Sequence, residues 1–254
     1  YPFAPAWHHL AYLWKAQLTP AWEQHHRDGK TNAITGRFFE PRVTEEFYDN
    51  QSDFDNVHNL IDAPAHQERI AEMRAALRQK QLELRDSGML PEKMRERRAA
   101  ENNLTIYEMV RNENLYPLES YLNAADLALE RDKSNLEAFV EWMSDDEEGI
   151  RWWAIVGLRL LDDAARPANA ILKKALTDES HEVRMMAAWI LIGLGQGDQA
   201  LETLDELVFE GTENEPMLHN VIDWIGEPAF PLVRKYLDNG GSREGRYGIS
   251  IFAR

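Results

Sequence analysis

Residues 64–85 have the hydrophobic periodicity of a helix. A proline stands at the start of this segment, where it fits the first turn of a helix. Four apolar side chains then recur at the spacing of one helix face: Ile70, Met73, Leu77 and Leu84. The sequence Asp-Ser-Gly-Met-Leu-Pro follows, with a glycine suited to a left-handed cap and a proline that cannot continue a helix. We therefore predict one long helix over residues 64–85.

The stretch before this helix has a less regular pattern. Residues 7–26 read as helical, with an interruption near Thr19 and Pro20, which suit a helix N-cap and first position. Two short apolar segments on either side of Pro41, at residues 38–39 and 46–48, are candidate strands. With the long helix, these segments predict a small α+β unit over residues 1–91.

An internal repeat occupies the second half of the chain. Residues 144–151 align with residues 177–184 at an offset of 33, which brings Arg151 onto Arg184. The downstream alanine and leucine positions match at the same offset. This period is typical of stacked helix pairs, and the spacing Asp-x-x-x-Val-Arg-x-x-Ala-x-x-x-Leu resembles HEAT repeats. We predict an α-solenoid of HEAT-like helix pairs over residues 104–254, with arginine and aspartate side chains forming a ladder between repeats.

A third, weaker copy follows 33 residues further on. Its two helices are predicted at residues 198–209 and 214–225. Between the two units, residues 92–103 have little apolar periodicity and carry several basic side chains: Lys93, Arg95, Arg97 and Arg98. We interpret this segment as a charged linker or an exposed helix, paired in part with neighbouring glutamates. The predicted fold is therefore mainly α, with a small α+β unit ahead of the solenoid.

The composition of the chain argues against several classes of partner and chemistry. The 254 residues include 44 acidic and 28 basic side chains, for a net charge of −16, which argues against a nucleic-acid partner. No apolar run approaches the length of a membrane span, so we expect no membrane partner. Because cysteine is absent, disulfides, thiol chemistry and cysteine-based zinc sites are excluded.

Residues 45–60 carry a second resemblance. They read Glu-Glu-Phe-Tyr-Asp-Asn-Gln-Ser-Asp-Phe-Asp-Asn-Val-His-Asn-Leu, a predicted strand, tight turn and helix entry. This resembles an element near the C-terminal end of formylglycine-dependent sulfatases, Glu-Glu-Leu-Tyr-Asp-Leu-x-x-Asp-Pro. The resemblance covers residues 1–91, and the helical repeats resemble the C-terminal extension of some bacterial sulfatases that act on polysaccharides.

The sulfatase resemblance implies a particular function. The chain would be the C-terminal part of a sulfuric-ester hydrolase, completing the pocket for a sulfated carbohydrate and stabilising an N-terminal catalytic domain. That domain would hold the formylglycine nucleophile and a bound calcium; neither can be assigned to this chain, which lacks the nucleophile motif and is expected to be inactive alone. Both chain ends read as cut, and a periplasmic or extracellular location is implied by the resemblance alone.

Few side chains are candidates for chemistry. The same resemblance makes His9, and then His8, candidates for substrate contact, although surface or packed histidines are the simpler interpretation. Asp49, Asp53 and Asp55 have the spacing of a calcium loop but lack its glycine and distal glutamate, so turn formation is favoured. Five tryptophans are assigned to the core, with Trp152 the best candidate for an exposed platform: Trp142, Trp152, Trp153, Trp189 and Trp224.

Two alternatives to the sulfatase hypothesis remain open. The first is a non-enzymatic HEAT-repeat module that binds a protein on its concave surface. The second is a phosphatase-type hydrolase of the same superfamily, because the C-terminal unit does not discriminate well between the two chemistries.

Overall fold

The computed structural model describes residues 11–212 and 214–238, and every regular element within them is a helix. The prediction of a mainly α fold is confirmed. The N-terminal part contains α1 (Ala11–Trp14), α2 (Leu18–Arg27), the 3-10 helices η1 (Arg37–Phe39) and η2 (Pro64–His66), and α3 (Gln67–Leu84). The next part contains η3 (Ser87–Met89), α4 (Glu92–Glu101), α5 (Ile106–Met109) and α6 (Leu118–Leu129).

The remaining helices form the repeats. They are η4 (Lys133–Asn135), α7 (Leu136–Trp142), α8 (Glu148–Leu160), η5 (Asp162–Ala168), α9 (Asn169–Ala175), α10 (His181–Gly193), α11 (Asp198–Phe209), α12 (Glu215–Ile225), η6 (Glu227–Ala229) and α13 (Phe230–Asp238). We call residues 89–238, apart from residue 213, the helical body. We call residues 11–66 the N-terminal arm.

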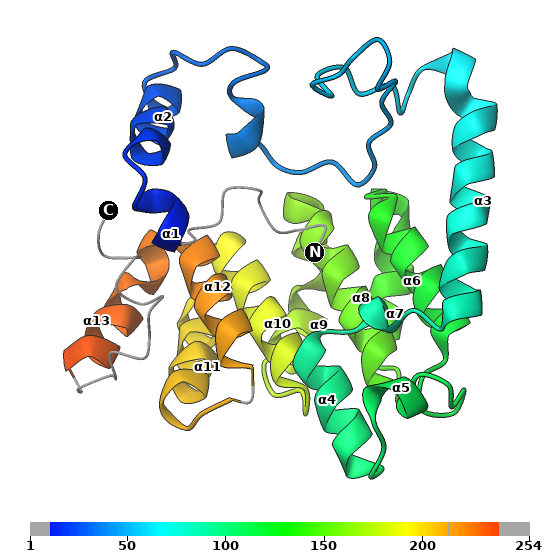
Figure 1. The fold of residues 1–254 in the computed structure, drawn as a ribbon. Coiled ribbons are helices and arrows are strands. Elements are labelled where there is room, and N and C mark those ends of the chain that lie inside the picture. Colours follow the sequence, from blue (N-terminus) through cyan, green and yellow to red (C-terminus); the bar gives the residue numbers. More distant parts are fainter. Residues whose placement is uncertain (1–10, 213, 239–254) are drawn as a thin grey trace.

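Helices pair and stack along the helical body. The pairs α7–α8, α9–α10 and α11–α12 follow one another, and their second helices α8, α10 and α12 contact one another in order (Figure 1). These second helices begin at Glu148, His181 and Glu215, which are 33 and 34 residues apart. The period of 33 read from the sequence is therefore the spacing of structural units, and the two helices predicted for the third copy are present.

The predicted polar ladder joins the first two pairs. The buried guanidinium of Arg151 donates from Nε to Asp178 at 2.9 Å and from Nη2 to Glu179 at 2.8 Å. The equivalent Arg184 instead donates to Glu206 of α11 at 2.9 Å. The ladder changes partner because the position 33 residues after Asp178 is Gly211, which has no side chain to accept the bond.

The segment predicted as a charged linker or an exposed helix does form a helix, α4, but this helix is packed rather than exposed. Met94 of α4 is fully buried, and Ala99 is nearly so. Arg98 donates to the Tyr121 hydroxyl at 2.6 Å and to Glu147 at 2.8 Å, while Arg97 pairs with Glu148 at the start of α8. These cations meet the acidic N-terminal turn of α8, so most of the charge on α4 serves to dock this helix on the helical body.

The N-terminal arm lies along one edge of the helical body (Figure 1). α1 and α2 lie beside α12 and α13, the irregular part of the arm crosses to the opposite end, and α3 runs beside α6. At one end, α2 comes close enough to α12 that the negative charge of Glu23, together with burial, raises the pKa of Asp223 to about 6. At the other end, Arg78 of α3 donates to Asp126 of α6 at 2.8 Å.

Several local expectations need correction. Neither predicted strand forms among the described residues, because residues 38–39 belong to η1 and residues 46–48 have no neighbouring strand with which to pair. The small α+β unit is therefore not present as such. The break between α1 and α2 falls at residues 15–17, and the left-handed residue after α3 is Arg85, at φ 56°, rather than a glycine.

None of the helices in the described part of the chain is long and apolar enough to cross a membrane.

Candidate functional site

A cavity of about 840 Å³ separates the N-terminal arm from the helical body. The helical body contributes Leu129 at the end of α6 and Trp153 of α8. The arm contributes aromatic and aliphatic side chains, including Trp22, Phe38 and Val57, together with the backbone and side chains of residues 40–44. The volume is within the range of cavities that hold ligands of several residues or a small molecule.

Arg37 fixes the arm side of this cavity. Its Nη1 donates to the carbonyl oxygens of Asn56 and Val57 at 3.1 and 3.2 Å, and its Nη2 donates to the Tyr48 hydroxyl at 3.0 Å. The guanidinium also lies 3.9 Å from the Glu46 carboxylate. One side chain thus holds η1, residues 46–48 and the turn before η2 together.

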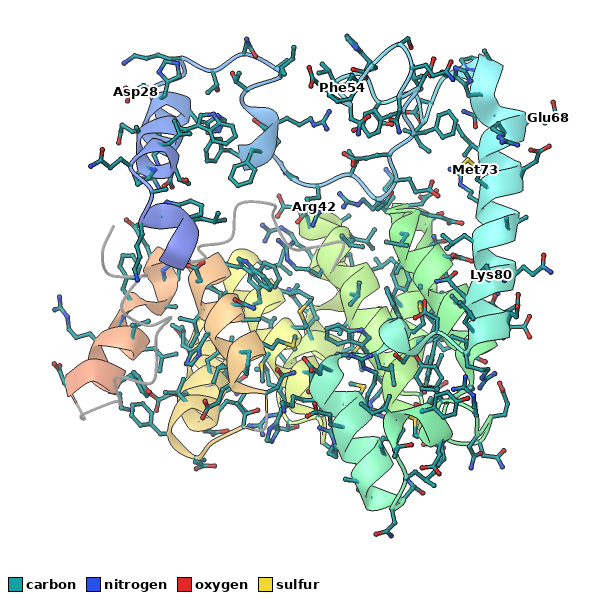
Figure 2. The ribbon with its side chains drawn as sticks, in the orientation of Figure 1. Asp28, Arg42, Phe54, Glu68, Met73 and Lys80 are labelled. Atoms are coloured by element: carbon teal, nitrogen blue, oxygen red, sulfur yellow. The ribbon has the colours of Figure 1, made fainter. Side chains whose placement is uncertain are left out.

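Arg42 is the contrasting cation at the same cavity. Its side chain is exposed and forms no hydrogen bond or ion pair within the part of the chain that the structure describes. Only its carbonyl oxygen is engaged, by Arg131 at 2.9 Å. Figure 2 shows Arg42 on the side of the arm that faces the helical body. The arm therefore places one anchored and one available guanidinium at the cavity.

The acidic residues of the arm form turns, as predicted. Asp53 accepts the backbone N–H groups of His58 at 2.7 Å and Val57 at 3.0 Å, and these bonds hold the pKa of its carboxyl below the usual value. Asp49 accepts hydrogen bonds from the Ser52 hydroxyl and the Gln51 backbone, which lower its pKa in the same way. No cluster of three metal-ligating side chains occurs in the described residues.

Exposed apolar side chains gather in the N-terminal third of the chain. Within residues 13–88, whose side chains are all described, Ile70 is the single buried large apolar residue. Seven others in the same range are more than half exposed: Leu18, Ile34, Val43, Phe54, Met73, Leu77 and Leu84. Phe54, at 90% exposure, lies at the outer rim of the arm (Figure 2). In the described part of the helical body, Tyr107 and Phe209 alone are comparable.

α3 shows this imbalance most clearly. The predicted helix forms, but of its four apolar positions only Ile70 is covered by the chain, at 3% exposure. We call the other three, Met73, Leu77 and Leu84, the α3 stripe. Two arginines of α3 pair with other parts of the chain: Arg74 with Glu45, and Arg78 with Asp126. Near the end of the helix, Leu82 packs against the core and is partly buried. These contacts hold α3 while the α3 stripe stays open to solvent.

The histidines predicted to contact substrate, His8 and His9, lie outside the described residues. The tryptophan assignment is correct in outline and wrong in one detail. Trp152 is buried in the core, so it cannot serve as an exposed platform. Its neighbour Trp153 lines the cavity and donates its indole N–H to the Met89 carbonyl at 2.9 Å. Neighbouring residues on a helix point to different sides, so the sequence predicted that the two tryptophan side chains have different surroundings. It did not predict which of the two faces the cavity.

These features define the class of protein: a stack of helix pairs that carries an N-terminal arm along one edge. Comparison with known families agrees. The family model for HEAT repeats matches residues 136–215, which covers α7 to α11 and the turn before α12. This part of the chain is therefore similar to HEAT repeats. Comparisons with curated proteins and with solved structures find no match.

The prediction that the chain is part of a sulfatase is wrong. The family match concerns the helical repeats, no sulfatase family matches the chain, and residues 11–91 do not have the predicted α+β fold. The motif in residues 45–60 misled because its Glu-Glu-Phe-Tyr-Asp sequence also suits an extended segment that runs into an aspartate-capped turn. The findings favour the helical-repeat alternative instead.

Sequence reasoning missed the arginines that position the site. Arg74 and Arg78 stand four residues apart beside the apolar positions of α3, a spacing that places both on one side of the helix. That signal could have indicated a polar contact face. Arg37 had no comparable signal, because its partners lie up to 20 residues away in irregular backbone.

Proposed function

We propose that this chain is a non-enzymatic HEAT-repeat module that binds a protein partner through the N-terminal arm and α3. The repeats act as the rigid support, and residues 11–88 provide the docking surface. The observation that carries this proposal is the concentration of exposed apolar side chains in residues 18–84, next to a helical body that buries its own. Exposed apolar side chains that gather in one part of a chain favour an interaction surface there.

The concave surface of the repeats is a weaker candidate for the docking surface. Residues 151–158 of α8 and residues 185–191 of α10 are all buried. A solenoid helix with one open binding face leaves part of its circumference exposed, whereas these two helices are enclosed. The contacts of α4 and α6 with α8 account for part of this coverage. A partner therefore reaches the arm and α3 more easily than the second helices of the first two repeats.

Burial of the α3 stripe by a partner favours association. Each of its side chains is more than half exposed, and full burial of such a side chain contributes about 1.5–3 kcal/mol. Because the side chains of the α3 stripe are exposed, substitutions there should weaken binding to a partner and leave the fold of the chain unchanged. This property allows a direct test.

The test compares a double variant with a matched control. Met73→Ser/Leu77→Ser removes the centre of the α3 stripe, and Phe209→Ser removes an exposed apolar side chain from the repeats. The wild-type chain is used to isolate partners from a lysate of its source organism, and each captured protein is purified and titrated by calorimetry. We expect the double variant to bind its partner at least about tenfold more weakly, and the control to bind as wild type.

Circular dichroism should show the same helix content in all three proteins, because the substituted side chains are exposed. Equal affinity of the double variant and the wild type would contradict the proposal, as would a wild-type chain that captures no specific protein.

A further inference from the structure

We propose that residues 44–48 present a free β-strand edge, to which the partner protein adds an extended segment of its own chain. This inference rests on the proposed function, because it names the kind of contact that the partner makes with the N-terminal arm. It is carried by the pattern of backbone hydrogen bonds in these five residues.

One edge of the segment is already paired. The Glu45 carbonyl accepts from the Asn59 side-chain amide at 3.3 Å. The Phe47 N–H donates to the Asn59 side-chain oxygen at 2.9 Å, and the Phe47 carbonyl accepts from the Leu60 N–H at 2.7 Å. All of these groups belong to odd-numbered residues, and all are engaged by residues 59–60.

The other edge is unpaired. Within the described part of the chain, the backbone N–H and C=O groups of Thr44, Glu46 and Tyr48 form no hydrogen bond to another protein group. The chain bends at Thr44, and residues 45–48 follow with no turn or bend. In extended backbone, alternate residues direct their N–H and C=O groups to opposite sides. The alternation of paired and unpaired residues therefore matches a strand with one edge in use and a second edge with six available groups.

The three residues with unpaired backbone groups, Thr44, Glu46 and Tyr48, all line the cavity, whereas Glu45 and Phe47 do not. Arg37 holds both Tyr48 and Glu46, so the edge is fixed in place before a partner arrives. Preorganisation of this kind reduces the entropy lost on binding.

These features identify the occupant as an extended segment of a partner protein. Backbone pairing supplies affinity in strand addition, and alternate side chains supply specificity. The side chain of Tyr48 favours aromatic or β-branched residues opposite it. The exposed Arg42 at the entrance favours an acidic residue at one end of the segment.

The probe is the blocked peptide acetyl-Glu-Thr-Val-Thr-Val-Thr-amide, added at about millimolar concentration to the full chain labelled with ¹⁵N. A matched peptide carries N-methyl groups on alternate residues, which removes the donors from one edge. We expect the unmodified peptide to slow amide exchange at Thr44, Glu46 and Tyr48 by about tenfold or more, and to leave the amide of Glu45 unchanged. The methylated peptide should give no protection.

Three outcomes would overturn the inference. The first is unchanged exchange at the three even-numbered residues. The second is equal protection from the methylated peptide, which would indicate docking through side chains alone. The third is protection that rises with protein concentration in the absence of peptide, which would assign the edge to a second copy of this chain. If the partner binds through the α3 stripe while these amides exchange freely in the complex, strand addition fails and the proposed function stands.

Discussion

Single residues set how closely the helices of the repeats approach. A Cβ atom built at Gly157 of α8 would lie 2.7 Å from ring atoms of Phe139 on α7, and one at Gly149 would lie 2.5 Å from the ring of Tyr121 on α6. Real Cβ atoms are not found at such distances, and both rings are fully buried. The first repeat therefore depends on two positions where the side chain is a hydrogen atom.

We predict that Gly157→Ala lowers the free energy of unfolding by about 1–3 kcal/mol, because the added methyl group forces the Phe139 ring out of its position. Gly193→Ala is the matched control, since a Cβ atom there meets nothing within 4 Å and alanine is the better helix former. The control should leave stability unchanged or raise it by up to about 1 kcal/mol. Urea unfolding followed by circular dichroism measures both changes. Equal stability of the Gly157 variant and the wild type would show that α7 and α8 are less tightly packed.

The sequence predicted the role of an individual residue well when the partners of that residue are close in the sequence. Asp49 and Asp53 were assigned to turns from spacing alone, and they form them, because an aspartate side chain reaches the backbone two to five residues ahead. The orientation of Trp152 and Trp153 was not predictable in the same way. It depends on which side of α8 the chain covers with η3, whose Met89 accepts the Trp153 indole hydrogen bond.

At the scale of elements, α3 and α4 show that similar sequences serve different roles. Both helices are rich in arginine and glutamate, and neither has a strong apolar face overall. The basic side chains of α4 meet the acidic first turn of α8, so that Met94 is drawn into the core. The arginines of α3 hold the helix against α6 and Glu45 while its apolar side chains remain exposed. Composition was therefore a poor guide to which charged helix is packed.

The junction of α4 and α8 should respond to pH. Burial alone would raise the pKa of Glu147, but hydrogen bonds from Tyr121 and the Gly149 backbone, together with the charge of Arg98, lower it below 4.5. A carboxyl group with a lowered pKa in the folded state stabilises the fold above its unfolded pKa and loses this contribution as pH falls. We predict that Glu147→Gln is about 2 kcal/mol less stable than the wild type at pH 7, and that the difference shrinks toward pH 3.

Unfolding in urea at the two pH values measures this difference. Glu137→Gln, an exposed change on α7, is the control and should differ from the wild type by less than about 0.5 kcal/mol at both values. A difference for Glu147→Gln that stays constant with pH would mean that its carboxylate is not held by these contacts.

Element boundaries in the repeats were predicted well, and those in the arm were not. α11 spans Asp198–Phe209, as read from the third copy of the repeat, and α12 begins one residue later than predicted. Such helices are specified by their own caps and apolar spacing, for example the Asn214 side chain that accepts the Met217 N–H. A strand is not specified by its own residues in this way, because its hydrogen bonds are made with another segment of the chain.

At the scale of the whole molecule, stability is distributed unevenly. The buried core extends from Met89 to Val233. From residues 13–88, Leu82 packs against this core and is partly buried, while Ile70 is buried outside it. A segment of this length cannot offset its loss of conformational entropy with so little burial. The N-terminal arm and α3 therefore depend on polar contacts with the helical body, and on a partner under the proposed function.

This distribution predicts two levels of hydrogen exchange in the free protein. Backbone amides of α3 should exchange through local opening, at a free energy at least about 2 kcal/mol below that of amides in α8 and α10. Exchange measured residue by residue at several low urea concentrations distinguishes the two groups, because the α3 values should not depend on urea as global unfolding does. Equal free energies in α3 and α8 would show that the arm and the repeats unfold as one unit.

The sequence by itself determined the helical class, the 33-residue period and the acidic turn with its arginine, since each depends on contacts between near neighbours or between identical units. It did not determine that residues 92–103 pack as a helix, that the α3 stripe stays exposed, or that residues 44–48 keep one edge unpaired. Those features depend on which distant segments meet, and the tertiary structure alone decided them. The same limit explains the incorrect sulfatase prediction: a short motif fixed a local turn, whereas the function depends on the surface that the arm and the repeats create together.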